Sequence, residues 1–264
     1  MITDRLYRSF ARAPILQKQL RRIVGRLPHR VREIEHFGQR LRIDPSELAG
    51  FYLYYEQEYD DFIFRFLEPK LASFDRALDI GAHYGIYSVF LGARMKRVDA
   101  FEPDKKTIRW LHGNLALNGL PTVTVHEKCI AQETGHVSFW TPPETNRGLA
   151  RIATPGEASA PLASLSLDDF LGGSNRDSCL VKMDIEGGEW LALKGAQKVW
   201  NPPHAPTSLL IEVHPEQIEA LGGTVDAFRN TLESMGFTVQ GLTPQGLVPL
   251  SPATFVRFWW AVSR

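Results

Sequence analysis

The stretch ALDIGAHYGIYS, residues 77–88, decides the fold of this chain. A short apolar run ends at Asp79, and the glycines Gly81 and Gly85 come just before a helical pattern begins. Glycine allows a tight turn and a close approach of the backbone to a ligand. A dinucleotide-binding turn needs G-x-G-x-x-G and a phosphate loop needs a Lys-Ser or Lys-Thr pair, and neither pattern occurs here. The turn therefore predicts a ligand that lacks a pyrophosphate.

Strand and helix patterns alternate after this turn. The expected strands are 76–80, 97–101, 123–130, 179–184, 209–214, 237–242 and 255–262, and the helices between them are 84–95, 105–118, 189–199 and 225–235. Repeated units of this kind build a mostly parallel sheet with helices on both faces. We predict an α/β, Rossmann-like domain over 70–264, with seven strands and one antiparallel edge strand. An extra hairpin strand is expected at 135–140 and a loop at 141–163.

Residues 1–69 are expected to form a separate extension that acts as a cap or as an oligomer contact. The pattern predicts a helix over 5–27, a hairpin over 31–43 and an aromatic helical stretch over 52–66. In the second case, that of an oligomer contact, the protein would be a homo-oligomer. These aromatics and the loop 141–163 are also expected to shape the pocket for the second substrate.

The composition is that of a globular protein, with 264 residues, 44% hydrophobic and 23% charged. Charge is unevenly spread: residues 1–32 contain nine basic and one acidic side chain, which leaves the rest of the chain with a net charge of −8. An acidic body makes a nucleic-acid partner unexpected, whereas the basic arm could contact an anionic membrane surface.

The location of the protein is predicted from what the chain lacks. No apolar run is long enough to cross a bilayer, and the N-terminus shows no signal-peptide pattern. Cys129 and Cys179 lie in apolar runs, where buried free thiols are expected rather than a disulfide or a metal site. We therefore expect a cytoplasmic protein.

Functional side chains are expected where the strands end, because ligands of such sheets bind at the carboxyl ends of the strands. Glu102 ends the second strand, where an acid can accept hydrogen bonds from both ribose hydroxyls. Ile130 ends the third strand and suits an adenine face. Together with Asp79, Gly81, His83 and Gly85 of the first turn, these residues are the predicted cofactor site.

The fourth and fifth strands end in acids and a histidine. Lys182-Met183-Asp184-Ile185-Glu186-Gly187 follows an apolar run, and Glu212-Val213-His214 ends the next strand. Residues two apart in a strand share a face, so Glu212 and His214 are expected to point the same way. We predict Asp184, Glu212 and His214 as catalytic residues, with His214 or Asp184 as the base.

At this point the chain resembles the FkbM-like family of methyltransferases. The matching segments, in the order of the family, are 78–82 with Gly85, 101–103, 114–118, 166–170, 181–187 with Glu189, and 211–214. The resemblance implies a class I methyltransferase fold, S-adenosylmethionine as methyl donor, and methyl transfer to a hydroxyl of a sugar or a glycosylated or secondary metabolite. It places Asp79, Gly81, Gly85 and Glu102 at the cofactor, and Asp184, Glu186, Glu212 and His214 at the acceptor. His83 departs from the family, which often has Asn there.

Several alternatives stay open from the sequence. A divalent cation, with Mg²⁺ first, could be held by Asp184 with Glu212 or Glu186, because these are oxygen ligands. An NAD(P)-dependent oxidoreductase is disfavoured by the failed glycine pattern, and a non-catalytic binding protein by the acids on both sides of the expected site. Within the enzymes, methylation of a protein or a lipid-linked glycan is a further alternative.

Overall fold

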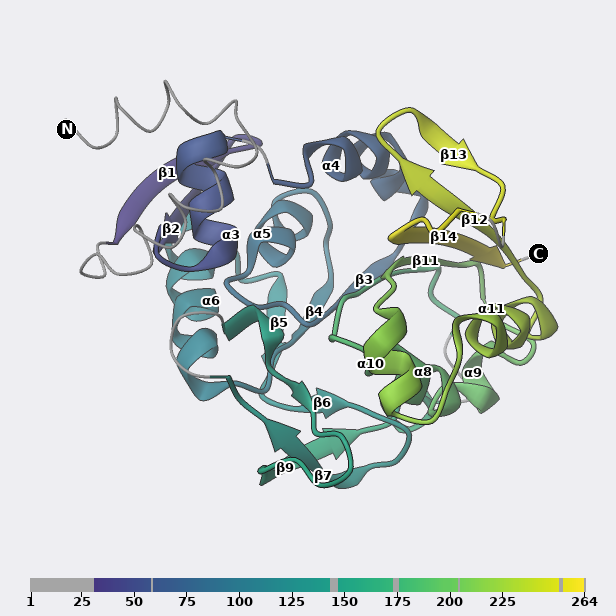
Figure 1. Cartoon of the computed structure of the whole chain (residues 1–264). Helices are drawn as coiled ribbons and strands as arrows, with labels where there is room; N and C mark the ends of the chain where they lie inside the picture. The colour runs from purple at the N-terminus through teal and green to yellow at the C-terminus, as the bar shows by residue number, and fades with distance from the viewer. Residues whose placement is uncertain are drawn as a thin grey trace.

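The computed structural model describes residues 31–57, 59–142, 147–172, 176–203, 205–251 and 254–263. The predicted helix over 5–27 and nearly all of the basic arm lie outside these residues. A large central sheet is flanked by helices on both faces, and a smaller sheet lies at one side of it (Figure 1).

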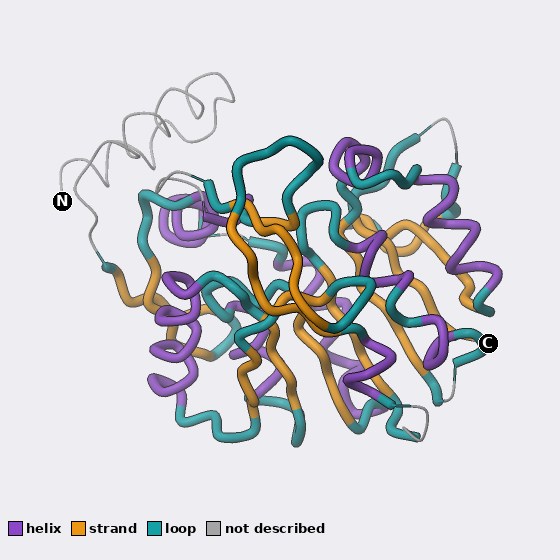
Figure 2. The backbone as a smooth tube through the Cα atoms, turned by 90° about the horizontal axis from the view of Figure 1, so that it is seen from below, coloured by secondary structure: helices purple, strands orange, loops and turns teal. Residues whose placement is uncertain are grey.

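The central sheet has eight strands in the order β13-β12-β14-β11-β10-β3-β4-β5. They are β3 (Arg76–Ile80), β4 (Val98–Phe101), β5 (Val123–His126), β10 (Cys179–Met183), β11 (Thr207–Glu212), β12 (Phe237–Thr243), β13 (Gly246–Val248) and β14 (Phe258–Ser263). The five strands from β11 to β5 are parallel. Figure 2 shows these strands side by side, with helices packed around them.

The predicted position of the antiparallel strand is wrong. β14 is antiparallel to both β11 and β12 and lies between them inside the sheet, so it is not an edge strand. Its Trp259, Trp260 and Ala261 are buried, which requires neighbours on both sides. The edge is instead the short strand β13, which forms a hairpin with β12 and brings the number of strands to eight rather than seven.

The helices predicted over 84–95, 105–118, 189–199 and 225–235 are present with shifted bounds, and two further short helices, at 167–171 and 215–220, were not predicted. They are α5 (Ile86–Gly92), α6 (Lys105–Asn118), α7 (Leu167–Leu171), α8 (Glu189–Lys194), α9 (Gln197–Trp200), α10 (Pro215–Ala220) and α11 (Val225–Ser234). The helix predicted over 189–199 is divided into α8 and α9. Alternate strand residues face opposite sides, and Leu78, Val181 and Leu209 belong to one hydrophobic cluster whereas their neighbours Ala77, Leu180 and Leu210 belong to another.

A second, four-stranded sheet corrects two expectations. Its strands are β6 (Cys129–Ile130), β7 (Gly135–Trp140), β8 (Arg151–Ile152) and β9 (Ala160–Leu165). The predicted strand 123–130 is therefore two strands in two sheets, because exposed Glu127 and Lys128 interrupt it. The predicted loop 141–163 contains β8 and most of β9, because its apolar residues pair with the predicted hairpin strand β7.

The N-terminal part of the described chain packs on the sheet domain. It contains the predicted hairpin, β1 (Arg32–His36) and β2 (Gln39–Ile43), then α3 (Leu48–Phe51), the π-helical turn η1 (Tyr52–Glu56), α4 (Asp61–Leu67) and the 3₁₀ helix η2 (Glu68–Ser73). The stretch predicted as helical over 52–66 is interrupted at Gln57 and Asp60, which have left-handed backbone conformations.

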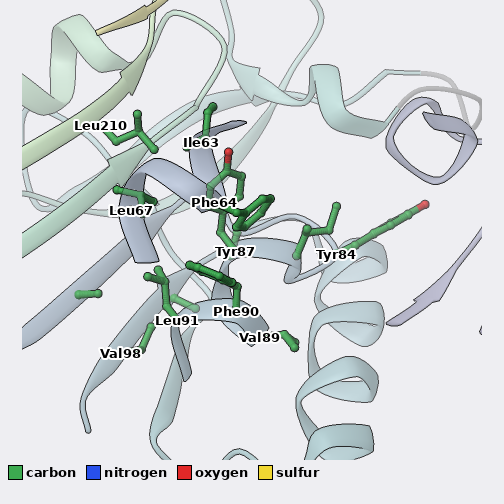
Figure 3. Packing of buried hydrophobic residues seen from close by; sticks show 14 of the residues in the cluster. Ile63, Phe64, Leu67, Tyr84, Tyr87, Val89, Phe90, Leu91, Val98 and Leu210 are labelled. Carbon is green, nitrogen blue, oxygen red and sulfur yellow. The ribbon is translucent and has the colours of Figure 1, made fainter. Parts of the chain in front are cut away.

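One apolar core joins the N-terminal part to the sheet. Phe64 stacks on Tyr87 with ring centroids 4.6 Å apart and meets Phe90 edge-on at 4.7 Å. Figure 3 shows α4 residues Ile63, Phe64 and Leu67 against α5 residues and Leu210 of the sheet. The division into 1–69 and 70–264 stays a prediction, and the described residues on either side of it share this core.

Two asparagines of α6 bind the backbone of β2. Asn114 accepts from Arg42 N (2.7 Å) and donates to Arg42 O (3.1 Å) and Tyr84 O (2.8 Å). Asn118, one turn later, makes the same pair of bonds to the backbone of Arg40, at 2.9 and 2.7 Å. A strand edge presents unpaired N–H and C=O groups, and these amides take their place opposite β2.

We predict that Asn114→Ala lowers the free energy of unfolding by about 2–3 kcal/mol, because it leaves buried backbone groups without partners. The matched control Asn118→Ala removes the same bonds at a solvent-accessible position and is expected to cost less than about 1 kcal/mol. Urea denaturation of both variants measures the difference, and equal losses would contradict the role given to Asn114.

Candidate active site

A cavity of about 450 Å³ lies at the carboxyl ends of β3, β4 and β10, the edge at which the sequence predicts the site. Three parts of the chain surround it. The sheet supplies Ile80–His83, Glu102, Asp184 and Glu212, the second sheet supplies Ile130, Phe139 and Ile152, and the N-terminal part supplies Leu48, Tyr52, Tyr59 and Asp60. Tyr52 and Tyr59 from the aromatic stretch 52–66 and residues 147–152 from the segment 141–163 line this cavity; that these segments shape the pocket of the second substrate stays a prediction.

The turn after β3 is pressed against the turn after β10. Gly81 has φ +82°, and a Cβ built on it would lie 1.9 Å from the carbonyl oxygen of Asp184. Both the backbone conformation and the missing side chain are therefore required here. Glycine is needed at this position for the contact between two strand ends, in addition to any contact with a ligand.

Lys182 ties the same two turns together with its ammonium group. Nζ donates to Gly81 O at 2.9 Å and lies 3.5 Å from Asp79 Oδ1 and 3.7 Å from Asp184 Oδ2. Burial opposes the charge, but the carboxylates of Asp79, Asp184 and Glu212 together outweigh it and raise the pKa of Lys182. The side chain is thus a buried cation under the cavity.

His83 and Glu102 form the wall at the end of β4. The backbone N–H of His83 donates to Glu102 Oε2 at 2.8 Å, and the N–H of Asp104 donates to Oε1 at 2.9 Å. Burial nevertheless raises the pKa of Glu102 to about 7. His83 has φ +51°, a left-handed conformation in which Asn, Asp and His are enriched among non-glycine residues. That conformation explains why His can stand where the family often has Asn.

The His83 ring is a neutral part of the wall. It stacks on Tyr84 with centroids 4.2 Å apart and an interplanar angle of 9°. Burial lowers the pKa of His83 to about 4, so the imidazole carries no charge at neutral pH. Its Nε2 is buried and makes no hydrogen bond to any residue that the structure describes.

Carboxylates gather at the other end of the cavity around His214. The imidazole Nε2 lies 3.6 Å from Glu186 Oε2, 3.6 Å from Glu212 Oε1 and 3.9 Å from Asp184 Oδ1. Burial disfavours the imidazolium, but Glu189, Asp184 and Glu186 together raise the pKa of His214 to about 9. The predicted approach of Asp184, Glu212 and His214 is therefore present in the structure.

Three predicted residues lie behind the cavity wall rather than on it. Asp79 is fully buried and accepts from Ser88 Oγ at 2.5 Å, and Gly85 faces Leu111. His214 sits behind the acids, with Nδ1 3.3 Å from buried Glu189. These three are absent from the described residues that line the cavity, so the structure places them one layer behind it, and the roles predicted for Asp79 and Gly85 at the cofactor and for His214 as a base stay predictions. Gly81, His83, Glu102, Ile130, Asp184, Glu186 and Glu212 do line the cavity.

Other residues of the site were missed from the sequence. Asp60 accepts from Tyr87 Oη at 2.9 Å, and burial raises its pKa to about 6. Arg257 contacts Glu212 from the turn before β14. Arg147 bonds Asp104 at 2.8 Å. These residues lie far from the strand-end motifs in the sequence. Lys182 was also missed, although it lies in β10 two residues before Asp184, and a lysine inside a buried strand was a signal that could have revealed it.

Comparison with known proteins identifies the family. Residues 79–239, more than half of the chain, match the Methyltransferase FkbM domain. The chain belongs to the FkbM methyltransferase family. This match supports a methyltransferase over an oxidoreductase. No curated protein matches the sequence.

Three solved methyltransferase structures that resemble this FkbM-family protein share 20% or less of its sequence. The FkbM methyltransferase from Methylobacillus flagellatus is 20% identical with a TM-score of 0.44, over 71% of this chain but only 43% of its own length. An rRNA methylase from Streptococcus thermophilus is 13% identical (TM-score 0.44; 78% and 96% covered). A SAM-dependent methyltransferase from Agrobacterium tumefaciens is 11% identical (TM-score 0.47; 90% and 71% covered). The family assignment rests on the matched domain.

We predict that Gly81→Ala destabilises the protein more than Gly119→Ala does. Gly119 also has positive φ, but no atom lies within 4 Å of the position that a Cβ would take there, so Ala costs only the left-handed backbone, about 1–2 kcal/mol. At Gly81 the clash with the Asp184 carbonyl is added, and the loss of unfolding free energy should be at least about twice as large. Equal losses in chemical denaturation would show that the two turns are not in tight contact.

Proposed function

We propose that this FkbM-family protein is an S-adenosylmethionine-dependent O-methyltransferase whose acceptor is a hydroxyl of a sugar or of a glycosylated or secondary metabolite. One observation carries the proposal: a single cavity runs from Glu102 and Ile130 at one end to Asp184 and Glu212 at the other. The end proposed for the nucleoside and the end proposed for the acceptor hydroxyl thus belong to one cavity of about 450 Å³, within the usual range for small-molecule sites.

The residues at the first end fit the cofactor. Each Glu102 carboxylate oxygen accepts one backbone N–H and keeps acceptor capacity for a ribose hydroxyl. Ile130, Phe139 and Ile152 offer an apolar surface to the adenine. Gly81 and His83 border the space between the two ends. When bound, the cofactor supplies a methyl group activated by a sulfonium.

The residues at the second end fit a hydroxyl acceptor. We assign Asp184 as the proton acceptor, because it lines the cavity with 27% of its side chain exposed, whereas His214 lies behind it and Glu212 contacts Arg257. Lys182 and the His214 imidazolium outweigh burial and lower the pKa of Asp184, so this carboxylate stays ionised. Methyl transfer requires donor and acceptor in line, and Asp60 and Tyr59 on the opposite wall can help to orient a hydroxylated acceptor.

The wider predictions about the protein stay predictions. They are a small-molecule acceptor rather than a nucleic acid, a cytoplasmic location, a membrane contact through the basic arm, and a homo-oligomer. Cys129 and Cys179 are buried free thiols. Within the part of the chain that the structure describes, helices long and apolar enough to span a bilayer do not occur.

We predict that the purified protein transfers a labelled methyl group from S-adenosylmethionine to a neutral, hydroxyl-rich small molecule in a protein-free and nucleic-acid-free metabolite extract. Asp184→Asn should lower this turnover about 100-fold or more, because a general base contributes about 10²–10⁴-fold. Binding of S-adenosylhomocysteine should change little in this variant.

The matched control is Asp226→Asn, which alters an exposed acid that does not line the cavity. It should keep wild-type turnover. Label that appears in the protein or nucleic acid of a whole lysate but not in the metabolite extract would contradict the proposed acceptor. Full turnover in Asp184→Asn would contradict the proposed base.

We also predict a pH dependence of cofactor-product binding that originates at Glu102. A hydroxyl donates more strongly to a carboxylate than to a carboxylic acid, and the pKa of Glu102 in the free protein is about 7. Its ionised fraction therefore rises about tenfold between pH 6 and pH 8, and S-adenosylhomocysteine should bind up to about tenfold more tightly at pH 8.

Isothermal titration calorimetry at both pH values measures this effect. Glu102→Gln cannot ionise and should bind weakly, with this rise between pH 6 and pH 8 removed. Glu219→Gln, at an exposed position outside the cavity lining, should keep the wild-type profile. A rise of the same size in Glu102→Gln would assign the titration to another group.

A further inference from the structure

We propose that Asp184, Glu212 and His214 form a binding site for a divalent transition metal, Mn²⁺ or Zn²⁺, at the acceptor end of the cavity. One carboxylate oxygen of each acid and one imidazole nitrogen all lie within 4.8 Å of one another. Two donors that are each about 2.1 Å from one ion are at most about 4.2 Å apart. The 3.6 Å from His214 Nε2 to Glu212 and the 3.9 Å to Asp184 satisfy this limit. The two carboxylate oxygens lie within 4.8 Å of each other, so they need to approach by at most about 0.6 Å when an ion binds.

The imidazole itself points to a ligand. His214 is only 9% exposed, and its Nε2, which faces the three acids, makes no hydrogen bond to any of the described residues. The other ring nitrogen, Nδ1, lies 3.3 Å from Glu189 Oε1. A histidine that binds a metal usually gives its second ring nitrogen to a carboxylate, which fixes the ring. His214 has this arrangement once an ion displaces the proton from Nε2, which leaves Nδ1–H directed at Glu189.

Glu189 is built to hold that orientation. It is fully buried, and the same Oε1 accepts the backbone N–H of Ile185 at 2.8 Å. Ile185 follows Asp184, so the group that orients the imidazole is tied to the chain next to the first acid. Glu189 is therefore a positioning residue, which acts on the ion through His214.

The charges around the imidazole favour a cation. Glu186, whose Oε2 lies 3.6 Å from His214 Nε2, provides a further oxygen donor. Lys182 faces Oδ2 of Asp184 and leaves Oδ1 turned toward His214. Arg257 competes for Glu212, but 63% of its side chain is exposed, so its guanidinium can move into solvent when an ion binds.

The donor set selects the metal. Mg²⁺ and Ca²⁺ prefer oxygen ligands, whereas imidazole suits zinc and other transition metals and carboxylate suits Mn²⁺. One imidazole and two carboxylates therefore favour Mn²⁺ or Zn²⁺ over Mg²⁺, the cation named first among the alternatives that the sequence leaves open. An ion here reaches the cavity beside Asp184, where a Lewis acid would lower the pKa of an acceptor hydroxyl.

The test is direct metal binding by the full chain, freed of metal with a chelator and measured without a methyl donor. We expect one equivalent of Mn²⁺, followed by electron paramagnetic resonance, and one of Zn²⁺, followed by calorimetry, each bound at least about tenfold more tightly than Mg²⁺. Glu189→Gln should weaken binding about 10–100-fold. His214→Ala and Asp184→Asn should weaken it at least as much.

The matched control is His126→Ala, which removes another histidine paired with a carboxylate, Asp99 at 2.8 Å, outside the cavity lining. It should keep wild-type affinity. Asp184 is partly exposed, so Asp184→Asn keeps the test valid if His214→Ala does not fold. Absence of saturable Mn²⁺ and Zn²⁺ binding, or affinity unchanged in Asp184→Asn and His214→Ala, overturns the site. Neither result depends on methyl transfer, which the labelled-cofactor assay reports separately.

Discussion

The buried ammonium of Lys182 is the interaction on which the site depends. It joins the carbonyl of Gly81, the carboxylate of Asp79 and the carboxylate of Asp184, and so links the ends of two neighbouring parallel strands. Parallel strands bring their carboxyl ends to one edge of the sheet. This alone would place the negative charges of Asp79 and Asp184 side by side with no positive charge to offset them. Lys182 compensates them and allows the two turns to approach until only glycine fits at position 81.

The rest of the cavity is built around this fixed edge by segments outside the parallel strands. Leu48, Tyr52 and Asp60 come from the N-terminal part, and residues 147–152 come from a 3₁₀ turn (Arg147–Leu149) and strand β8 of the second sheet, which follows it. Arg147 links the two, because its side chain bonds Asp104 and its backbone N–H donates to Glu47 Oε2 at 3.1 Å. Gly81, His83 and Glu102, which are expected to bind the cofactor, are thus positioned by the strands of the central sheet. The part of the cavity wall that the N-terminal segment forms is positioned instead by hydrogen bonds between loops.

The sequence predicted the parallel part of the sheet because each strand there is a short apolar run followed by a turn and a helix. It did not predict the place of β14, since strand order in a sheet is set by contacts distant in the sequence. Residues 160–163 fall in the predicted loop 141–163 because Pro and Ala are weak strand formers, and they form most of β9 only through pairing with β7. The acids were found because they directly follow apolar strands. Asp60 and Arg257 were not, because only tertiary packing brings them to the cavity.

Helix α6 has a consequence for redesign. Its first turn follows Glu102, its N-cap Asp104 holds Arg147, and its last turns hold the hairpin through Asn114 and Asn118. One helix therefore holds both the segment that contains Arg147 and the β1–β2 hairpin. In a redesign, Asp104, Asn114 and Asn118 can be kept as fixed attachment points while the segments bound to them are replaced. Such a change would alter the acceptor pocket and leave the central sheet unchanged.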